Sequence, residues 1–203
     1  MAIVDYGLGN IKAFANVYNQ LNIPVAIATK AGDMKKATKI ILPGVGAFDY
    51  ALQRLDQSGM RYILDEMVLH RGVAVLGVCV GMQILAHSSE EGSLPGLGWI
   101  DAEVKKFDFS ACERAVRVPH MGWNDVKVVR ANSLIRERDH GQRFYFLHSY
   151  YMHCKNNGNI IAVTDYGGEF ACAVNSGNIY GVQFHPEKSH RWGIQLLRDF
   201  AEL

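Results

Sequence analysis

The sequence of 203 residues predicts an α/β protein with a central, mostly parallel sheet and helices on both of its faces. Strand-like and helix-like segments alternate up to Ser88. An apolar run at residues 73–76 leads into a tight, glycine-flanked turn at residues 77–81. After Gly92 the segments become short and β-rich, which indicates antiparallel additions in the C-terminal half. Because no linker or repeat interrupts the chain, we expect residues 1–203 to form a single domain.

The first half of the chain is predicted as alternating strands and helices. We expect strands at residues 2–5, 24–28, 39–42 and 73–76, and helices at residues 11–21, 47–55, 60–69 and 84–86. Gly7 and Gly9 follow the first strand as in a dinucleotide-binding turn, but the third glycine of that fingerprint is replaced by Lys12, so no nicotinamide site is expected. Asn10 can present a polar group at the carboxyl edge of the sheet, where ligands of such folds bind.

The second half is predicted as short strands closed by one helix. We expect strands at residues 99–107, 116–118, 126–129, 144–146, 160–164, 170–175 and 179–182, with turns at residues 156–158 and 166–168. The closing helix spans residues 189–203 and carries Trp192, Leu196 and Phe200 on one face.

Composition argues against several classes of function. The net charge of +1 gives no basic face for nucleic acid or an anionic membrane. The longest apolar stretch, residues 73–86, is short and interrupted by glycine, and Asp5 falls where a signal peptide needs an apolar core. The cysteines are widely spaced, which argues against zinc and disulfides and favours the reducing cytoplasm. They are Cys79, Cys112, Cys154 and Cys172. We therefore expect no metal and no cofactor.

Cys79 lies at the centre of the tight turn, with Gly77 and Gly81 two residues away on either side. A nucleophile with this spacing, between a strand and a helix, is typical of a nucleophile elbow, here with cysteine in place of serine. The glycines remove the clashes that a Cβ would make in so tight a turn. The free N–H groups and dipole of the following helix favour a thiolate. From this pattern alone, a buried cysteine that packs as a small hydrophobe stays open as an alternative.

His185 and Glu187 lie two residues apart at the end of a predicted strand. Residues i and i+2 of an extended chain point to the same side, so the carboxylate can orient the imidazole. With Cys79 they supply a nucleophile, a base and an orienting group. A solvated strand end is the alternative for the His-x-Glu pair taken alone.

A glycine-rich segment follows the predicted strand at residues 39–42. Its backbone N–H groups, at Gly44, Val45 and Gly46, can face a ligand without obstruction by side chains. Beside a nucleophile elbow, this segment becomes the second donor of an oxyanion hole, and the N–H of Val80 is the first. An ordinary strand–helix connection is the alternative.

The segments Gly-Val-Cys-Val-Gly-Met-Gln at residues 77–83 and Gln-Phe-His-Pro-Glu at residues 183–187 resemble those of the class I, triad-type glutamine amidotransferases. The resemblance implies a flavodoxin-like three-layer fold and hydrolysis of L-glutamine through a cysteinyl thioester. It implies Cys79 as nucleophile, His185 as general acid and base, and Glu187 as orienting group. Residues that match glutamine-binding positions of the family are Gly46, Gln83, Glu91, and the backbone at Ser149 and Tyr150.

Further motifs are similar to one subgroup, the glutaminase subunits of imidazole glycerol phosphate synthase in histidine biosynthesis. They are Asp-Tyr-Gly-x-Gly-Asn at residues 5–10, Leu-Pro-Gly-Val-Gly at 42–46, Pro-His-Met-Gly-Trp-Asn at 119–124 and Phe-x-His-Ser-Tyr at 146–150. This resemblance implies a heterodimer with a (βα)8-barrel cyclase that receives the ammonia. Positions that match its subunit interface are Asn10, Trp123, Tyr145 and Lys188. In the subgroup, the Pro-Gly-Val-Gly segment reorients to complete the oxyanion hole.

The chain departs from the subgroup's pattern at two places, and the second of them leaves the ammonia acceptor open. Val80 stands where the family usually has leucine, which matters little if a backbone N–H is the contribution. Residues 189–193 look closer to paralogues that supply ammonia to enzymes amidating bacterial surface sugars. A cysteine hydrolase of the protease type shares the elbow but gives no reason for Gln83 or the Pro-Gly-Val-Gly segment. A binding-only relative is disfavoured, because Cys79, His185 and Glu187 are all present.

Overall fold

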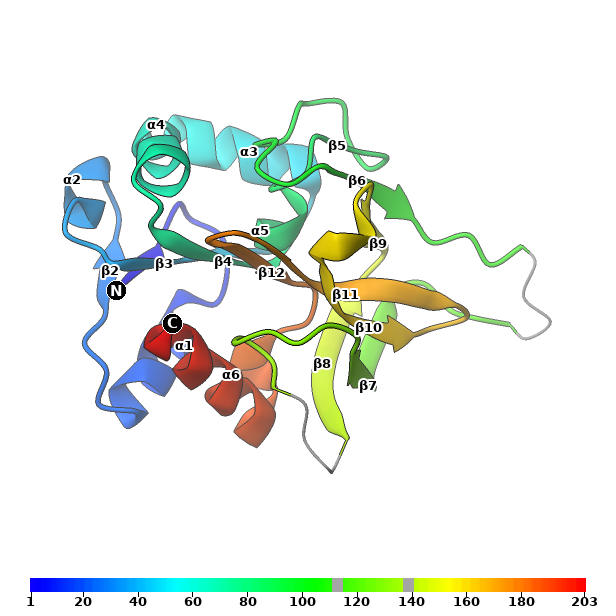
Figure 1. The fold of residues 1–203 in the computed structure, drawn as a ribbon. Helices are drawn as coiled ribbons and strands as arrows, with labels where there is room; N and C mark the ends of the chain where they lie inside the picture. The colour runs from blue at the N-terminus through cyan, green and yellow to red at the C-terminus, as the bar shows by residue number, and fades with distance from the viewer. Residues whose placement is uncertain (111–114, 137–140) are drawn as a thin grey trace.

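A nine-stranded sheet crosses the centre of the computed structural model, which describes residues 1–110, 115–136 and 141–203. Its strand order is β2-β1-β3-β4-β12-β11-β10-β7-β8. A separate three-stranded sheet, in the order β5-β6-β9, lies beside it. Figure 1 shows helices on both faces of the central sheet, in three layers. The predicted α/β fold class is therefore confirmed in its arrangement.

The parallel half of the central sheet follows the flavodoxin-like order of strands. It consists of β1 (Ala2–Val4), β2 (Ala26–Ala28), β3 (Lys39–Gly44), β4 (Ala74–Cys79) and β12 (Ile179–Val182). β12 comes from the far end of the sequence and pairs in parallel with β4, with Val182 opposite Val78. This pairing brings the segment that carries His185 beside the turn that carries Cys79.

The antiparallel half confirms the predicted change, after Gly92, from alternating helices and strands to short antiparallel strands. It contains β11 (Glu169–Ser176), β10 (Ile160–Asp165), β7 (His120–Val128) and β8 (Gln142–His148). The small sheet contains β5 (Ser88–Ser89), β6 (Ala102–Lys106) and β9 (Tyr150–Cys154). The sequence did not predict this second sheet. The strand predicted at residues 116–118 is wrong, since Pro119 has no N–H and the ladder with β8 begins at His120.

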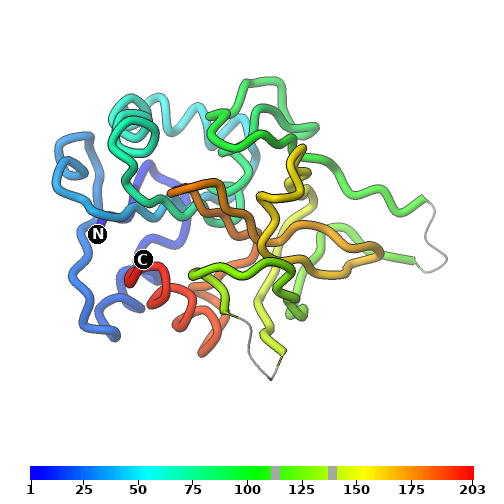
Figure 2. Tube along the Cα trace, viewed as in Figure 1, coloured from blue at the N-terminus to red at the C-terminus, as the bar shows by residue number. Residues whose placement is uncertain are grey.

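Two layers of helices cover the sheet. α1 (Ile11–Gln20) and α6 (His190–Glu202) lie on one face, and α3 (Phe48–Gln57) and α4 (Arg61–Asp65) lie on the other (Figure 1). Figure 2 shows the C-terminal helix folded back beside the N-terminal segment, and the hydroxyl of Tyr18 donates to the Leu197 carbonyl at 3.2 Å. The shorter elements are α2 (Ala31–Met34), the π-helical turn η1 (Glu66–His70), α5 (Val80–Gln83), and the 3-10 turns η2 (Asn157–Asn159) and η3 (Pro186–Lys188).

The helices bury aromatic and aliphatic side chains against both faces of the sheet. α1 buries Phe14 and Tyr18, and α3 buries Phe48 and Leu52. Each fully buried side chain of this size stabilises the fold by about 1.5–3 kcal/mol. In the described part of the chain, no helix has the length and apolar character needed to cross a membrane.

The helix predicted to continue through residues 84–86 is wrong. α5 is four residues long and ends at Gln83. The carbonyl oxygens of Ile84, Leu85 and Ala86 accept hydrogen bonds from the N–H groups of Leu97, Ile100 and Gly98, at 2.8, 3.0 and 3.1 Å. Because these carbonyls are taken by a distant segment, they are not available to continue the helix.

Candidate active site

Cys79 occupies the strained position that the elbow pattern predicts. It ends β4 with φ of 55° and ψ of −115°, a region that residues with a Cβ rarely adopt. A Cβ on Gly77 would come within 2.6 Å of the Gly81 carbonyl oxygen, and a Cβ on Gly81 would overlap the Leu42 carbonyl oxygen. The glycines therefore allow β3, β4 and α5 to meet at backbone distance and hold the thiol at the strand end.

The predicted oxyanion segment differs from the expectation at one residue. Gly44 still belongs to β3, with Cys79 as its Cα partner in β4, so the loop begins at Val45. Val45, Gly46 and Val80 all line the cavity beside Cys79. Gly46 has φ of +91° and open space around it, so glycine is needed there for the backbone angle and not for room.

His185 and Glu187 form a buried pair. The Nδ1 atom of His185 lies 3.0 Å from Oε1 of Glu187, and their side chains are 4% and 1% exposed. The short η3 turn after His185 folds the carboxylate back onto the ring. Because Nδ1 is held by the carboxylate, Nε2 is the ring nitrogen left to serve the thiol. The other oxygen of Glu187, Oε2, is buried without a hydrogen-bond partner among the described residues.

The electrostatic setting of His185 favours its protonated form. Burial opposes a charge on the ring, but hydrogen bonds and charge interactions with Cys79 and Glu187 outweigh it and raise the pKa of His185 to about 10. A protonated imidazole stabilises a neighbouring thiolate and holds the proton that a leaving nitrogen needs. Gln183 adds a further donor, with Nε2 at 3.8 Å from the Cys79 sulfur. The four-residue helix α5 contributes little dipole of its own.

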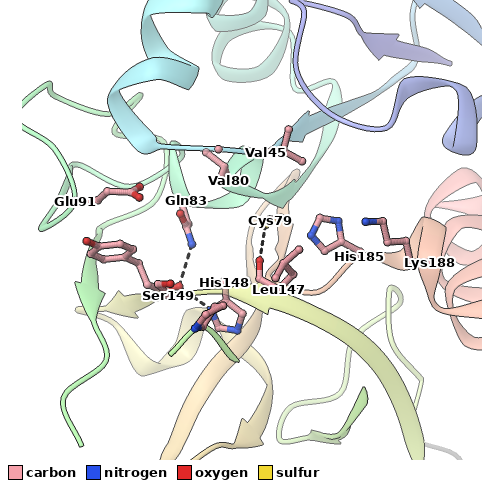
Figure 3. A pocket seen from close by; sticks show the side chains of 13 residues that line it. Val45, Cys79, Val80, Gln83, Glu91, Leu147, His148, Ser149, His185 and Lys188 are labelled. Atoms are coloured by element: carbon pink, nitrogen blue, oxygen red, sulfur yellow. Dashed lines mark hydrogen bonds between the residues drawn. The ribbon is translucent and has the colours of Figure 1, made fainter. Parts of the chain in front are cut away.

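These groups open into one cavity of about 310 Å³, shown in Figure 3. The cavity is lined by Val45, Gly46, Cys79, Val80, Gln83, Glu91, Pro119, Leu147, His148, Ser149, Tyr150, His185 and Lys188. The predicted glutamine-binding residues Gly46, Gln83, Glu91, Ser149 and Tyr150 are all in this set. The structure thus brings together residues from six separate stretches of the sequence.

Two of the predicted glutamine-binding side chains also make contacts within the protein. The Nε2 atom of Gln83 donates to the carbonyl of Tyr150 and to Oε1 of Gln183, at 3.0 Å each. Oε2 of Glu91 accepts from the N–H of Phe48, at 2.8 Å, and so ties the start of α3 to the cavity wall. The Glu91 carboxylate is the negative group of the cavity wall on the side away from His185 (Figure 3).

Three of the predicted interface residues form one cluster at the cavity's outer edge. Trp123 and Tyr145 are opposite each other in β7 and β8, with ring centroids 6.3 Å apart. The Nζ of Lys188 lies 5.8 Å from the centre of the Tyr145 ring, within the range of a cation–π contact. Asn10 is exposed on a separate turn at the start of α1, next to η3.

Sequence reasoning missed several polar residues around the cavity. Tyr6 is buried, and its hydroxyl donates to the Pro43 carbonyl at 2.7 Å, just before the glycine-rich segment. Gln183, His120 and His148 are also buried polar groups with partners near Cys79 or Tyr150. Each lies inside a motif that the sequence analysis quoted, and a buried polar residue flanked by strand residues is the signal that could have found them.

Among residues 1–110, 115–136 and 141–203, no cluster of histidine, cysteine and carboxylate side chains could hold a metal ion. Cys154 and Cys172 are buried free thiols like Cys79, and Cys112 lies outside the described residues. Burial raises the pKa of Cys154 to about 11, so that thiol stays protonated at neutral pH and is a poor nucleophile.

Comparison with known proteins identifies the family. The model of the family "Glutamine amidotransferase class-I" matches residues 2–202. The imidazole glycerol phosphate synthase subunit HisH of Leptospira interrogans is 53% identical over 203 residues, which cover 100% of each chain. The subunit of the same name from Bdellovibrio bacteriovorus is 55% identical over 201 residues, 99% of this chain and 98% of the relative.

Solved structures agree on the fold. One described as a glutamine amidotransferase superposes with a TM-score of 0.73 at 19% identity, covering 100% of this chain and 99% of the other. PurLQS from Thermotoga maritima gives 0.71 at 17% identity, covering 99% and 96%. The predicted family, fold class and amidotransferase activity are confirmed. The chain belongs to the class-I glutamine amidotransferases, in the group of the HisH subunits of imidazole glycerol phosphate synthase.

Proposed function

We propose that the chain hydrolyses L-glutamine to glutamate and ammonia at Cys79 and passes the ammonia to a separate cyclase subunit that makes imidazole glycerol phosphate. The observation that carries this proposal is the meeting of Cys79 with the buried His185–Glu187 pair in a cavity of about 310 Å³. A carboxamide is a poor electrophile, and its cleavage needs a strong nucleophile, a proton donor and donors for the oxyanion.

The first half of the reaction forms a thioester. The Cys79 sulfur attacks the side-chain carboxamide carbon of glutamine, and its oxygen takes up the negative charge. The N–H groups of Val80 and of the segment Gly44–Gly46 are the proposed donors to that oxygen, with Gly44 at the strand end and Val45 in the loop. Protonated His185 then gives its proton to the leaving nitrogen, the C–N bond breaks, and ammonia departs.

The second half returns the enzyme to its starting state. Neutral His185 takes a proton from water, and the hydroxide attacks the thioester carbon. The C–S bond breaks and glutamate leaves, so one glutamine and one water yield one glutamate and one ammonia. Glu187 keeps the ring in the orientation that serves both halves.

The cavity has complementary groups for the amino-acid end of glutamine. The carboxylate of Glu91 suits the α-ammonium group, and the backbone at Ser149 and Tyr150 suits the α-carboxylate. Gln83 braces that backbone through the Tyr150 carbonyl. The scissile amide then lies toward Cys79 and Gly46.

The cluster of Trp123, Tyr145 and Lys188 is the proposed contact with the cyclase, together with Asn10. Trp123 is 40% exposed and the neighbouring Met121 is 64% exposed, which is large for apolar side chains and typical of a docking surface. Ammonia released into bulk water would be protonated and lost, so a partner that covers this edge is needed to use it. Because a catalytic thiol works only when reduced, we place the enzyme in the cytoplasm.

The experiment compares two nitrogen sources for synthesis of imidazole glycerol phosphate by the two-subunit complex. Cys79→Ala is expected to abolish synthesis from glutamine and to leave synthesis from added ammonium intact. Loss of the ammonium-driven reaction as well would contradict the division of labour between subunits. If the wild type supports an enzyme that amidates surface sugars but not the cyclase, the acceptor in this proposal is wrong.

A further inference from the structure

A series of hydrogen bonds runs from β7, which lies between β10 and the edge strand β8, to the wall of the cavity through two buried histidines. The Nδ1 atom of His148 lies 2.8 Å from the carbonyl oxygen of Tyr150, and its Nε2 lies 3.0 Å from Nδ1 of His120. The Nε2 atom of His120 lies 3.3 Å from Nδ2 of Asn124, which also donates to the carbonyl of Asp165 at 2.8 Å. Neither histidine has a role in the proposed reaction.

The hydrogen-bond partners of His148 and His120 determine which ring nitrogen of each carries the hydrogen. The Tyr150 carbonyl can only accept, so Nδ1 of His148 carries the hydrogen and Nε2 is bare. Bare Nε2 accepts from Nδ1–H of His120, whose own Nε2 then accepts from Asn124. The Asn124 amide cannot be reversed, since its nitrogen donates to Asp165 and its oxygen accepts from the N–H of Asp125 at 2.8 Å. Both imidazoles are therefore neutral and held in one tautomer.

The surroundings of the two rings keep them neutral. His120 lies between the rings of Phe146 and Tyr166, with centroids 4.6 and 3.9 Å away. Burial lowers the pKa of His120 to about 4, and burial lowers that of His148 to about 3. At neutral pH both rings are therefore uncharged and have no proton to donate to a substrate, unlike His185.

The carbonyl of Tyr150 connects the two histidines to Cys79 through Gln83 and Gln183. It also accepts from Nε2 of Gln83, which donates its other hydrogen to Oε1 of Gln183. Gln183 in turn places its Nε2 3.8 Å from the sulfur of Cys79. The preceding carbonyl, of Ser149, accepts from the N–H of Phe107 at 3.4 Å. With both carbonyls hydrogen-bonded, the two peptide planes that follow Ser149 and Tyr150, at the start of β9, are held relative to Cys79.

We propose that His148 and His120 are positioning residues that hold the Ser149–Tyr150 backbone, where the α-carboxylate of glutamine binds, at a set distance from Cys79. The inference rests on the proposed function. Binding at one end of glutamine and attack at the other require a fixed separation between the clamp and the sulfur. Loss of these hydrogen bonds would loosen the Ser149–Tyr150 backbone and leave the chemistry at Cys79, His185 and Glu187 in place.

The kinetic test uses the complex in which the wild type hydrolyses glutamine. His148→Phe is expected to raise KM for glutamine by about tenfold while kcat changes far less. The variant loses the hydrogen bond to the Tyr150 carbonyl, which holds the backbone that binds the charged α-carboxylate. His148→Asn keeps a donor in the place of Nδ1 and is expected to restore most of the affinity. His153→Phe, an exposed histidine on β9, is the matched control and is expected to leave KM unchanged.

A second readout is independent of activity. In the free chain, imidazole nitrogen chemical shifts are expected to show Nδ1–H and bare Nε2 for both His120 and His148 at neutral pH. Nε2–H tautomers or charged rings would overturn the proposal, as would an unchanged KM in His148→Phe or a loss confined to kcat. A wild type without glutaminase activity would refute the proposed function instead, and the nitrogen shifts would still decide whether the chain of hydrogen bonds exists.

Discussion

Gly44 is the Cα partner of Cys79, so the last residue of β3 lies directly beside the nucleophile at the end of β4. A Cβ on Gly44 would overlap the backbone nitrogen of Gly81 and come within 2.8 Å of the carbonyl carbon of Val80. The elbow and the oxyanion segment are thus joined by backbone contacts that glycine alone permits.

Gly81→Ala is expected to destabilise the fold by about 2 kcal/mol or more and to abolish glutaminase activity, because its Cβ would overlap the Leu42 carbonyl. Urea denaturation measures the free energy of unfolding. Gly32→Ala is the control, since nothing lies within 4 Å of its added Cβ. Equal stability of Gly81→Ala and wild type would show that the elbow is not packed as described.

Cys79→Ser is expected to lower the pKa of His185 from about 10. Burial alone depresses this pKa, and it is the hydrogen bonds and charges of Cys79 and Glu187 that raise it. Replacing the thiol with a hydroxyl removes the contribution of Cys79 and leaves that of Glu187. Titration of the His185 ring by nuclear magnetic resonance measures the change. An identical pKa in the variant would mean that thiol and imidazole do not interact.

Glu187→Gln is expected to slow glutamine hydrolysis less than His185→Ala. Removing the proton carrier costs about 10⁴-fold or more in kcat, as for other triads, and the loss on removing the orienting group is smaller. Among the described residues, the carboxylate of Glu187 has Nδ1 of His185 as its hydrogen-bond partner, at 3.0 Å, and none at the thiol. Steady-state glutamate release measures both. The reverse order would assign the proton transfer to Glu187.

Stability is expected to fall as the pH drops below about 6.5, the usual pKa of histidine in an unfolded chain. The folded-state pKa of His120 is about 4 and that of His148 about 3, so between these values and 6.5 the unfolded state binds more protons. His148→Asn removes one of the two groups. The variant should therefore lose less stability than wild type between neutral and acidic pH in urea denaturation, and equal slopes would contradict neutral burial of His148.

Trp123→Ala is expected to weaken association with the cyclase by about 2 kcal/mol, roughly 30-fold, and to weaken that association more than it weakens the fold. Trp123 is 40% exposed and stacks on His190 with ring centroids 5.3 Å apart, so its truncation removes docking surface together with some packing within the subunit. Calorimetric titration measures the affinity. Tyr62→Ala on α4, an aromatic residue that is 81% exposed, is the control and should bind as wild type does. Unchanged affinity of Trp123→Ala would reject the interface.

The sequence was sufficient to predict the elbow and the His185–Glu187 pair, because each of them is local. The spacing of Gly77, Cys79 and Gly81 is enough to predict the tight turn, and His185 and Glu187 lie within three residues of sequence. Spacing alone could not show that β12 pairs with β4 and so brings His185 to Cys79. The motif resemblance supplied that adjacency, and the sheet order explains it.

Features that depend on distant partners were not predictable. Residues 84–86 have helical character, yet their carbonyls bond to residues 97–100. The strand β7 was predicted only from residue 126, because Pro119 and Gly122 interrupt its alternation. The hydrogen bond from His120 to His148 was not predicted either, because it joins β7 to β8 and the pairing of these two strands was not predicted.

The most direct test of the central claim is glutamate release from glutamine, measured for the chain alone, with the cyclase, and with the cyclase and its ribonucleotide ligand. The account predicts low release by the chain alone and a large rise in the three-component mixture, with none from Cys79→Ala. Absence of glutamate release under all three conditions would contradict the assembly of Cys79, His185 and Glu187 into a working site.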